Sequence, residues 1–286
     1  MSLFYKHTKV VVLGVLILSN ILVWRAVWSL APDDKLKVYF FDVGQGDAIL
    51  IESPDHRRIL VDGGPNRKVV SELGKVMPFG DKRIDAVLES HPDKDHVGGL
   101  PEVVNRFKVG LFVESGAESE NSIDDELKKR LEQKKIPRMF ARSGMVINLG
   151  DGVKLAILFP DQNVSRWETN DASIVAKVIY KGKSFLLTGD SPLRIENILV
   201  RKNKNILKSD VLKAGHHGSR TSTSLLYAQA VKPEYTIISA GKDNRYGHPH
   251  RETLEALSNV RSTVLSTSDL GTIKFETDGE TLEWNN

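Results

Sequence analysis

Six of the eight histidines in this chain fall in three close pairs. This clustering constrains the fold more than any other feature of the sequence. The pairs are His91/His96, His216/His217 and His248/His250. Each pair follows an apolar, strand-like run or lies in a glycine-rich loop, and binding residues converge where strands give way to loops. A single pair of this kind is most often a surface or helix-capping feature. Three pairs with acidic residues nearby instead predict one site assembled from distant parts of the sequence.

The chain contains no cysteine, so any metal ion must be held by His, Asp or Glu. The richest stretch for this purpose is 90–99, SHPDKDHVGG, which directly follows an apolar run. It offers four potential ligands within six positions, namely His91, Asp93, Asp95 and His96. In an extended loop, alternation would direct the first three to one side, and His96 would follow at the turn into a helix. Two divalent ions could then share these ligands. The alternative is a solvated acidic turn, which leaves the histidines at its ends without a purpose.

Apolar and amphipathic runs along the rest of the chain predict two β-sheets with helices outside. Strands are expected at 37–41, 48–53, 57–64, 86–90, 153–160, 173–180, 183–190, 210–215 and 235–239. Helices are expected at 98–107, 124–135, 191–200, 223–231 and 251–258. A tight turn at 44–47 makes the opening strands an antiparallel meander. We therefore expect an α/β fold, an αββα sandwich, as a single domain over residues 32–286.

The N-terminal stretch 1–31 is different in character. Its apolar run at 10–24, VVVLGVLILSNILVW, follows Lys6 and Lys9 and is shorter than the roughly 20 residues of a bilayer span, but continuation to Ala31 supplies the length. It predicts one hydrophobic helix, either an uncleaved signal anchor or a signal peptide cleaved after Ser29-Leu30-Ala31. A buried soluble helix is the third alternative. Under the first two, the domain is exported, and is either membrane-anchored or secreted.

The net charge of +3 also belongs to this N-terminal stretch. Residues 1–31 contain three basic residues and no acid, so residues 32–286 carry 37 basic and 37 acidic residues. The bulk charge of the domain therefore gives no support for a polyanionic substrate. A basic helix face within 128–135 could follow a nucleic-acid backbone, although such runs are usually solvated.

The stretch 91–96 resembles the HxHxDH signature of the metallo-β-lactamase superfamily, with Asp93 where the second histidine usually stands. Thr188-Gly189-Asp190 resembles the segment whose aspartate bridges two metals, and 213–219, KAGHHGS, resembles the segment that supplies the last histidine ligand. More narrowly, seven ordered motifs over residues 38–250 resemble the hydrolase domain at the C-terminus of ComEC-type DNA-uptake proteins. These motifs are FFDVGQGDAILIES, LVDGG, SHPDKDHVGG, NDASIV, LLTGD, LKAGHHGS and YGHPH. The resemblance implies the metallo-β-lactamase fold and a pair of divalent metal ions.

The resemblance also implies how the metal ligands divide. One metal would take His91 and Asp93, the other Asp95, His96 and His217, with Asp190 bridging them. His216 would then face the substrate, and the reverse assignment of His216 and His217 stays open. A further histidine usual in the superfamily has no counterpart between 97 and 189, where Asn170, Asp171 and Ser173 stand instead. An oxygen-rich site shifts the preference toward Mn²⁺ or Mg²⁺, with Zn²⁺ still open.

Several other polar residues are candidates for contacting substrate or for orienting the ligands. Asp62 in the VDGG turn either orients a ligand through hydrogen bonds or stabilises its own turn. The loop DNRYGHPH, 243–250, either brings His248 or His250 to the substrate or forms the start of a helix. The catalytic candidates are Asp95, His216, His248 and His250. The substrate-binding or orienting candidates are Asp62, Asn170, Asp171, Ser173, Asn244 and Tyr246.

Metal-dependent hydrolysis is the expected activity, because two metals lower the pKa of a water and clamp the oxygens of an electrophilic centre. The resemblance implies a phosphodiesterase or nuclease acting on DNA or a related phosphodiester outside the cytoplasmic membrane. Hydrolysis of a small ester, lactone or amide is the first alternative, and a non-catalytic metal- or DNA-binding accessory is the second. The uptake proteins carry a multi-helix channel and this chain has at most one span, so we expect a stand-alone relative of their hydrolase domain. An uptake channel protein is a candidate partner.

Overall fold

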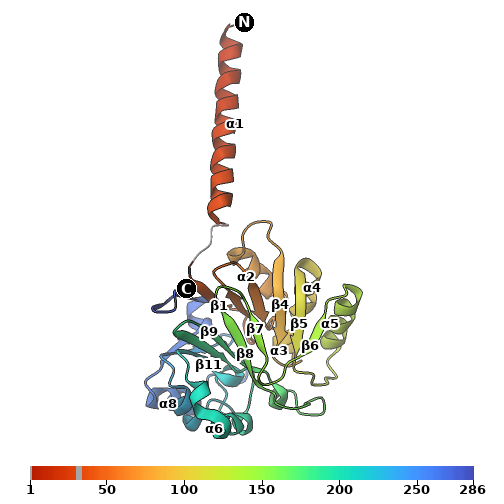
Figure 1. Cartoon of the computed structure of the whole chain (residues 1–286), viewed down its shortest axis with the longest axis vertical. Helices are drawn as coiled ribbons and strands as arrows, with labels where there is room; N and C mark the ends of the chain where they lie inside the picture. Colours follow the sequence, from red (N-terminus) through yellow and green to blue (C-terminus); the bar gives the residue numbers. More distant parts are fainter. Residues whose placement is uncertain (1, 30–33) are drawn as a thin grey trace. The chain divides into compact units, whose positions relative to one another are not determined.

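The computed structural model describes residues 2–29 and 34–286, and the chain divides into two units, 1–33 and 34–286. The first unit contains one helix, α1 (Ser2–Ser29), where the sequence predicted a hydrophobic helix serving as an anchor or signal peptide (Figure 1). Within the described ranges, no helix combines the length and the apolar character that a bilayer crossing requires. The expected domain boundary after residue 31, and Leu30 and Ala31 of the expected cleavage site, lie outside the described residues.

The second unit is built on two sheets, of which the first has eight strands in the order β15-β14-β1-β2-β3-β4-β5-β6. Its strands are β1 (Leu36–Phe40), β2 (Ile49–Glu52), β3 (Arg58–Val61), β4 (Arg83–Glu89), β5 (Lys108–Glu114), β6 (Arg138–Phe140), β14 (Ile273–Thr277) and β15 (Leu282–Asn285). The antiparallel pairing of β1, β2 and β3 confirms the predicted meander. From β3 to β6 the strands run parallel. The C-terminal hairpin β14–β15 returns to pair with β1.

The second sheet has seven strands in the order β13-β12-β11-β10-β9-β8-β7. They are β7 (Val146–Asn148), β8 (Lys154–Phe159), β9 (Val175–Tyr180), β10 (Lys183–Leu187), β11 (Val211–Lys213), β12 (Tyr235–Ile238) and β13 (Thr263–Ser266). Strands β7 to β10 are antiparallel, and β10 to β13 are parallel.

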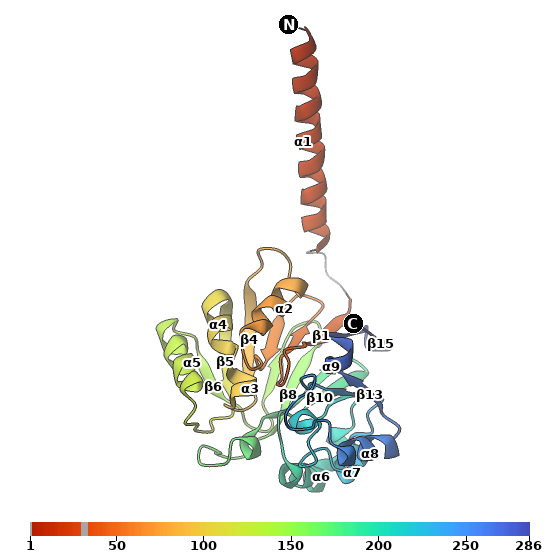
Figure 2. The ribbon, with the colours of Figure 1, turned by 180° about the vertical axis from the view of Figure 1, so that it is seen from behind.

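Helices cover the outer face of each sheet, and the two sheets enclose a common apolar core (Figures 1 and 2). The helices are α2 (Lys68–Val76), α3 (Lys94–Val97), α4 (Leu100–Arg106), α5 (Ser122–Gln133), α6 (Leu193–Leu207), α7 (Leu225–Val231), α8 (Arg251–Asn259) and α9 (Thr267–Leu270), with 3-10 turns η1 (Asn170–Ala172) and η2 (Gly215–Gly218). Helices α2, α4 and α5 pack on the first sheet, and α6, α7 and α8 pack on the second. The predicted αββα sandwich is thus confirmed.

The direction of the strands determines where polar residues gather. Strands β1, β3 and β4 run the same way in the first sheet, and β10, β11 and β12 run the same way in the second. Ligands of α/β proteins bind beyond the carboxyl ends of such strands. The loops and short helical turns that follow these strands contain all three histidine pairs.

Candidate metal centre

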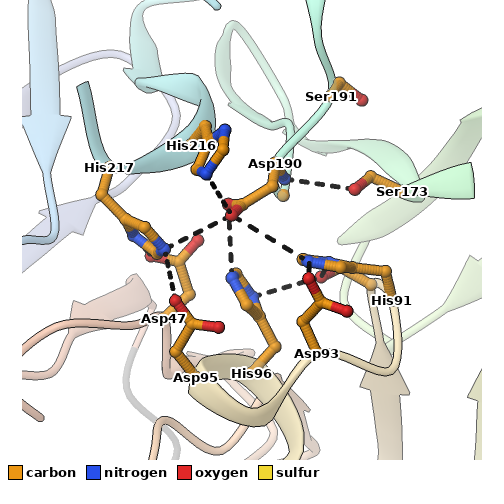
Figure 3. A network of polar contacts seen from close by, with 12 residues as sticks. Asp47, His91, Asp93, Asp95, His96, Ser173, Asp190, Ser191, His216 and His217 are labelled. Atoms are coloured by element: carbon orange, nitrogen blue, oxygen red, sulfur yellow. Dashed lines mark hydrogen bonds and ion pairs between the residues drawn. The ribbon is translucent and has the colours of Figure 1, made fainter. Parts of the chain in front are cut away.

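The carboxylate of Asp190, in the loop after β10, lies at the middle of the site (Figure 3). Four histidine Nε2 atoms approach it: His96 at 3.2 Å, His217 at 3.4 Å, His216 at 3.6 Å and His91 at 4.0 Å. Asp190 and three of these histidines are buried, whereas His216 is partly exposed. The structure therefore brings the first two histidine pairs to one carboxylate.

The stretch 91–96 is not extended throughout, which corrects one expectation. Helix α3 begins at Lys94, with Asp93 at its N-cap position, so Asp95 lies in the first helical turn. Asp93 Oδ2 remains 3.7 Å from His91 Nε2, whereas Asp95 Oδ2 lies 3.2 Å from His217 Nε2. The helical turn, rather than strand-like alternation, thus separates the two aspartates onto different histidines.

Asp62 orients both histidines of the first pair from behind. It accepts hydrogen bonds from His96 Nδ1 at 2.8 Å, from the Ser90 backbone N–H at 2.7 Å and from Ser90 Oγ at 2.7 Å. Because the Ser90 hydroxyl donates to Asp62, its oxygen accepts from His91 Nδ1 at 3.0 Å. Both rings therefore keep a proton on Nδ1, so Nε2, which faces Asp190, is the nitrogen left to bind a cation. Of the two roles predicted for Asp62, this geometry matches the orienting one.

Asp47 lies behind the ring of His217 at a longer distance, a position that the sequence did not predict. Its Oδ1 atom faces His217 Nδ1 at 3.5 Å, and its Oδ2 atom forms a buried ion pair of 2.7 Å with Lys213 Nζ. A Cβ atom on Gly46 would lie 2.2 Å from the carbonyl oxygen of Asp95, so only glycine lets this turn approach α3 so closely. The sequence signal for this position of Asp47 is the turn GQGD, in which a glycine precedes an aspartate.

The donor atoms fit a divalent cation. Among the described residues, His91 Nε2, His96 Nε2, His217 Nε2 and Asp190 Oδ1 are buried and have no hydrogen-bond partner. Unpaired buried groups are costly and need an explanation, which a cation would provide. Asp47, His96, Asp190 and His217 each place one such atom within 4.8 Å of the others. Asp47 faces His217 Nδ1 and pairs with Lys213 Nζ. We therefore assign Asp47 to orienting His217 rather than to binding the metal.

The pKa values describe the same arrangement electrostatically. Burial would lower the pKa of His96 and of His217, but the Asp190 charge, with Asp62 or Asp47 respectively, raises both well above their usual range. Burial and the charge of His96 lower the pKa of His91 to about 4. Burial would raise the pKa of Asp190, but the charges of His217 and His96 hold it well below its usual range. In the metal-free chain, protons thus occupy positions where a cation would bind.

His216 and His217 are adjacent, but they differ in burial. Both have left-handed backbone conformations, with φ of 47° and 55°, which is uncommon for residues other than glycine and marks functional sites. His217 is 1% exposed and lies between Asp95 and Asp190, whereas the His216 side chain is 29% exposed. The geometry therefore places His217 among the buried donor atoms and leaves His216 on the exposed side of the site.

The segment 170–173 contributes less than the sequence suggested. Ser173 Oγ accepts a hydrogen bond from the Asp190 backbone N–H at 3.2 Å, so it helps to place that carboxylate. Asp171 points to Arg194 in an ion pair of 2.5 Å. Asn170 Oδ1 is buried without a partner in the described chain. The structure therefore does not bring Asp171 to the site.

The loop 241–250 brings the third histidine pair beside the first two. The His248 ring centre lies 5.7 Å from that of His216 and 4.9 Å from that of His250, and Tyr246 stacks on it at 5.5 Å. Asn244 holds the loop by donating to His248 O at 2.7 Å and accepting from His248 N at 3.0 Å. Burial and the charges of His217, His216 and His250 lower the pKa of His248 to about 4, so the ring is neutral at physiological pH.

Comparisons with known proteins agree with this site. The family model described as "Metallo-beta-lactamase superfamily" matches residues 41–242. The chain is similar to ComE operon protein 3 of Bacillus subtilis (strain 168), with 33% identity over 84% of this chain and 33% of that protein. It is also similar to the competence protein ComA of Neisseria gonorrhoeae, with 29% identity over 92% of this chain and 35% of that protein. The chain thus spans about a third of the length of these relatives.

Among solved structures, the metallo-beta-lactamase fold protein YhfI from Bacillus subtilis superposes with a TM-score of 0.52 at 14% identity. The match covers 80% of this chain and 95% of that one. At this identity the likeness concerns the fold alone.

Proposed function

The chain belongs to the metallo-β-lactamase superfamily, and from that membership and the donor set around Asp190 we propose a metal-dependent hydrolase that cleaves a phosphodiester, with DNA as the first candidate substrate. The observation that carries this proposal is the convergence of three buried, unpaired Nε2 atoms on one buried carboxylate. Similarity to competence proteins supports a DNA-related role.

Two groups of residues would hold the metals. His91 and Asp93 would hold one ion, Asp95, His96 and His217 would hold the other, and Asp190 would bridge them; contacts of Asp93 with His91 and of Asp95 with His217 support this division. With three carboxylates among six donors, the set suits Mn²⁺ or Mg²⁺ as well as Zn²⁺. Bound divalent ions supply a water of lowered pKa and positive charge for the substrate oxygens.

The remaining residues would handle the substrate. His216 is partly exposed and lies 3.6 Å from Asp190, so its side chain can reach an oxygen of a bound phosphodiester. In the basic stretch 128–135, internal partners engage three of the five cations, whereas Lys129 and Lys135 are exposed. Lys128 pairs with Asp124, Arg130 with Glu126, and Lys134 donates to Asn105 O.

The location and partner of the enzyme are part of the same proposal. Lys6 and Lys9 before an apolar stretch support export of the hydrolase domain, either membrane-anchored or secreted. Similarity to competence proteins supports a DNA-uptake channel protein as a candidate partner. Cell fractionation with a protease-accessibility assay tests the location, and cross-linking in cells tests the partner.

Turnover by the full-length chain tests the activity. Single-stranded DNA, bis-p-nitrophenyl phosphate and a lactone would each be incubated with Mn²⁺, Mg²⁺ or Zn²⁺. We expect phosphodiester cleavage with at least one metal, and none with a chelator or in the Asp95→Ala/Asp190→Ala double variant. Lactone cleavage without phosphodiester cleavage would contradict the proposed substrate.

A further inference from the structure

The turn 44–47 contacts the loop 241–250 as well as α3. Gln45 stands between Gly44 and Gly46, whose φ values are 86° and 137°. A Cβ atom on Gly241 would lie 2.9 Å from the Gln45 backbone nitrogen, so the turn and the loop lie against each other. The turn that presents Asp47 to His217 thus also presents Gln45 to a second loop.

The contacts of Gln45 fix the orientation of its amide. The Gly241 backbone N–H donates to Gln45 Oε1 at 3.1 Å, and a backbone N–H can only donate. The amide oxygen is therefore held at Gly241, and the amide nitrogen faces His248 Nδ1 at 3.4 Å. An NH₂ group can only donate, so His248 Nδ1 has to accept. The ring proton of His248 consequently lies on Nε2.

This tautomer is opposite to that of the histidines around Asp190. His96 donates from Nδ1 to Asp62, and His217 places Nδ1 against Asp47. When these rings are neutral, their Nε2 atoms are left as lone pairs suited to a cation. His248 is left with an Nε2–H instead, which cannot bind a cation and can donate to an oxygen. A doubly protonated ring would set one N–H against the Gln45 NH₂ group, so Gln45 also opposes a charged His248.

We propose that Gln45 is a positioning residue that holds His248 in its Nε2–H tautomer, and that this N–H donates a hydrogen bond to an oxygen of the substrate at the metal centre. The ring is well placed for this, because its centre lies 5.7 Å from that of His216 and 6.4 Å from that of His217. Asn244 fixes the backbone on both sides of the ring. The substrate contact rests on the proposed phosphodiesterase function, whereas the tautomer does not.

The Gln45→Glu variant tests the proposal, because glutamate keeps an acceptor for Gly241 but replaces the donor that faces His248. Nitrogen NMR of the histidine side chains in the full-length chain would read the tautomer, with the His248 signal identified by its loss in His248→Gln. We expect Nε2–H in the wild type and a proton on Nδ1 in Gln45→Glu. With bis-p-nitrophenyl phosphate, kcat should fall by about 100- to 1,000-fold, the scale of one lost donor to a reacting oxygen, with little change in KM or metal affinity.

Two further variants complete the test. Gln133→Glu makes the same chemical change at an exposed position on α5 and should alter neither the tautomer nor kcat. Gln45→Met removes the donor without adding charge, should leave His248 as a mixture of tautomers, and serves if Gln45→Glu does not fold. A wild-type proton on Nδ1 of His248, or an unchanged kcat in both Gln45 variants, would overturn the proposal. If the wild type cleaves no phosphodiester while the tautomers respond as expected, only the proposed function fails.

Discussion

The floor of the site, His91, His96 and His217, and its rim, His216, His248 and His250, contain the same residue type in different surroundings. On the floor, each Nδ1 atom faces an oxygen, from Ser90, Asp62 or Asp47. On the rim, His248 Nδ1 faces the Gln45 amide nitrogen, and His250 Nδ1 accepts from the Arg220 backbone N–H at 3.2 Å. When neutral, the floor histidines therefore present Nε2 lone pairs, whereas His248 and His250 present Nε2–H groups. The group that contacts Nδ1 of a histidine thus determines whether its Nε2 atom can bind a cation or donate to an oxygen.

Replacing Lys213 by Met should have the largest effect, because it removes the charge that allows Asp47 to be buried behind the floor. Burial would raise the pKa of Asp47, but Lys213 and His217 hold it below its usual range. Leaving such a carboxylate unpaired costs about 3–5 kcal/mol. We expect the free energy of unfolding, measured with urea, to fall by about that amount. Arg251→Met, which breaks an exposed pair with Glu255, is the control and should show no measurable change. An equally stable Lys213→Met chain would contradict the role given to the Lys213 charge.

The Asp62→Asn variant should give His96 the tautomer that we assign to His248 on the rim. The Ser90 backbone N–H would hold the new amide oxygen, so the NH₂ group would face His96 Nδ1 and push the ring proton onto Nε2. We expect metal affinity, measured by titration calorimetry, to fall by about 10- to 100-fold. Asp62 has φ of 58°, and Asp151→Asn makes the same change at an exposed position with φ of 44°. Unaltered metal affinity in Asp62→Asn would contradict the claim that Asp62 sets the tautomer of His96 for metal binding.

The sequence identifies the metal-binding candidates of the floor far better than it identifies the residues that orient the histidines. His91, Asp93, Asp95 and His96 lie within six positions, so their type and spacing identify them without tertiary information. Gln45 and Lys213 have no such signal: one is a polar residue in a turn, and the other is a lysine at the end of a short strand. Their roles depend on loops nearly 200 residues apart in the case of Gln45 and Gly241.

The fold shows the same limit. Strands with strong apolar runs and the amphipathic helix α5 were predicted, because their pattern is local. The C-terminal hairpin β14–β15 was not assigned, because its burial comes from pairing with β1, more than 230 residues earlier. Helix α3 has only four residues, Lys94–Val97, too few for a periodic pattern to appear.

Metal binding should depend on pH through two histidines of the floor. Carboxylates raise the pKa of His96 and His217 in the metal-free chain, so a metal has to displace their protons. We expect affinity to rise by up to about tenfold per pH unit for each proton released, until the pH exceeds both raised pKa values. Calorimetry between about pH 6 and pH 9 in buffers of different ionisation enthalpy would count these protons.

Stability of the metal-free chain should change in the opposite direction. A raised folded-state pKa gives stabilisation that is fully present below the unfolded value of about 6.5 and is lost as the pH rises through the folded value. We therefore expect the Tm of the chelator-treated chain to fall above neutral pH, and the metal-loaded chain to resist this fall. Affinity and Tm that are both independent of pH would mean that these histidines hold no protons.

Truncating Tyr246 to Ala should have the smallest effect and should be confined to the rim. Its ring is 48% exposed and stacks on His248 with centres 5.5 Å apart and an interplanar angle of 21°. Such aromatic contacts contribute about 0.5–1.5 kcal/mol, which corresponds to about a two- to tenfold loss of kcat if the ring steadies His248. Metal affinity should not change, because no floor residue touches Tyr246 among the contacts of the described chain. Tyr246→Phe, which keeps the ring, is the matched control. A rise in KM for single-stranded DNA without a fall in kcat would instead assign the exposed face of the ring to the substrate, and His248 would then depend on Gln45 and Asn244 alone.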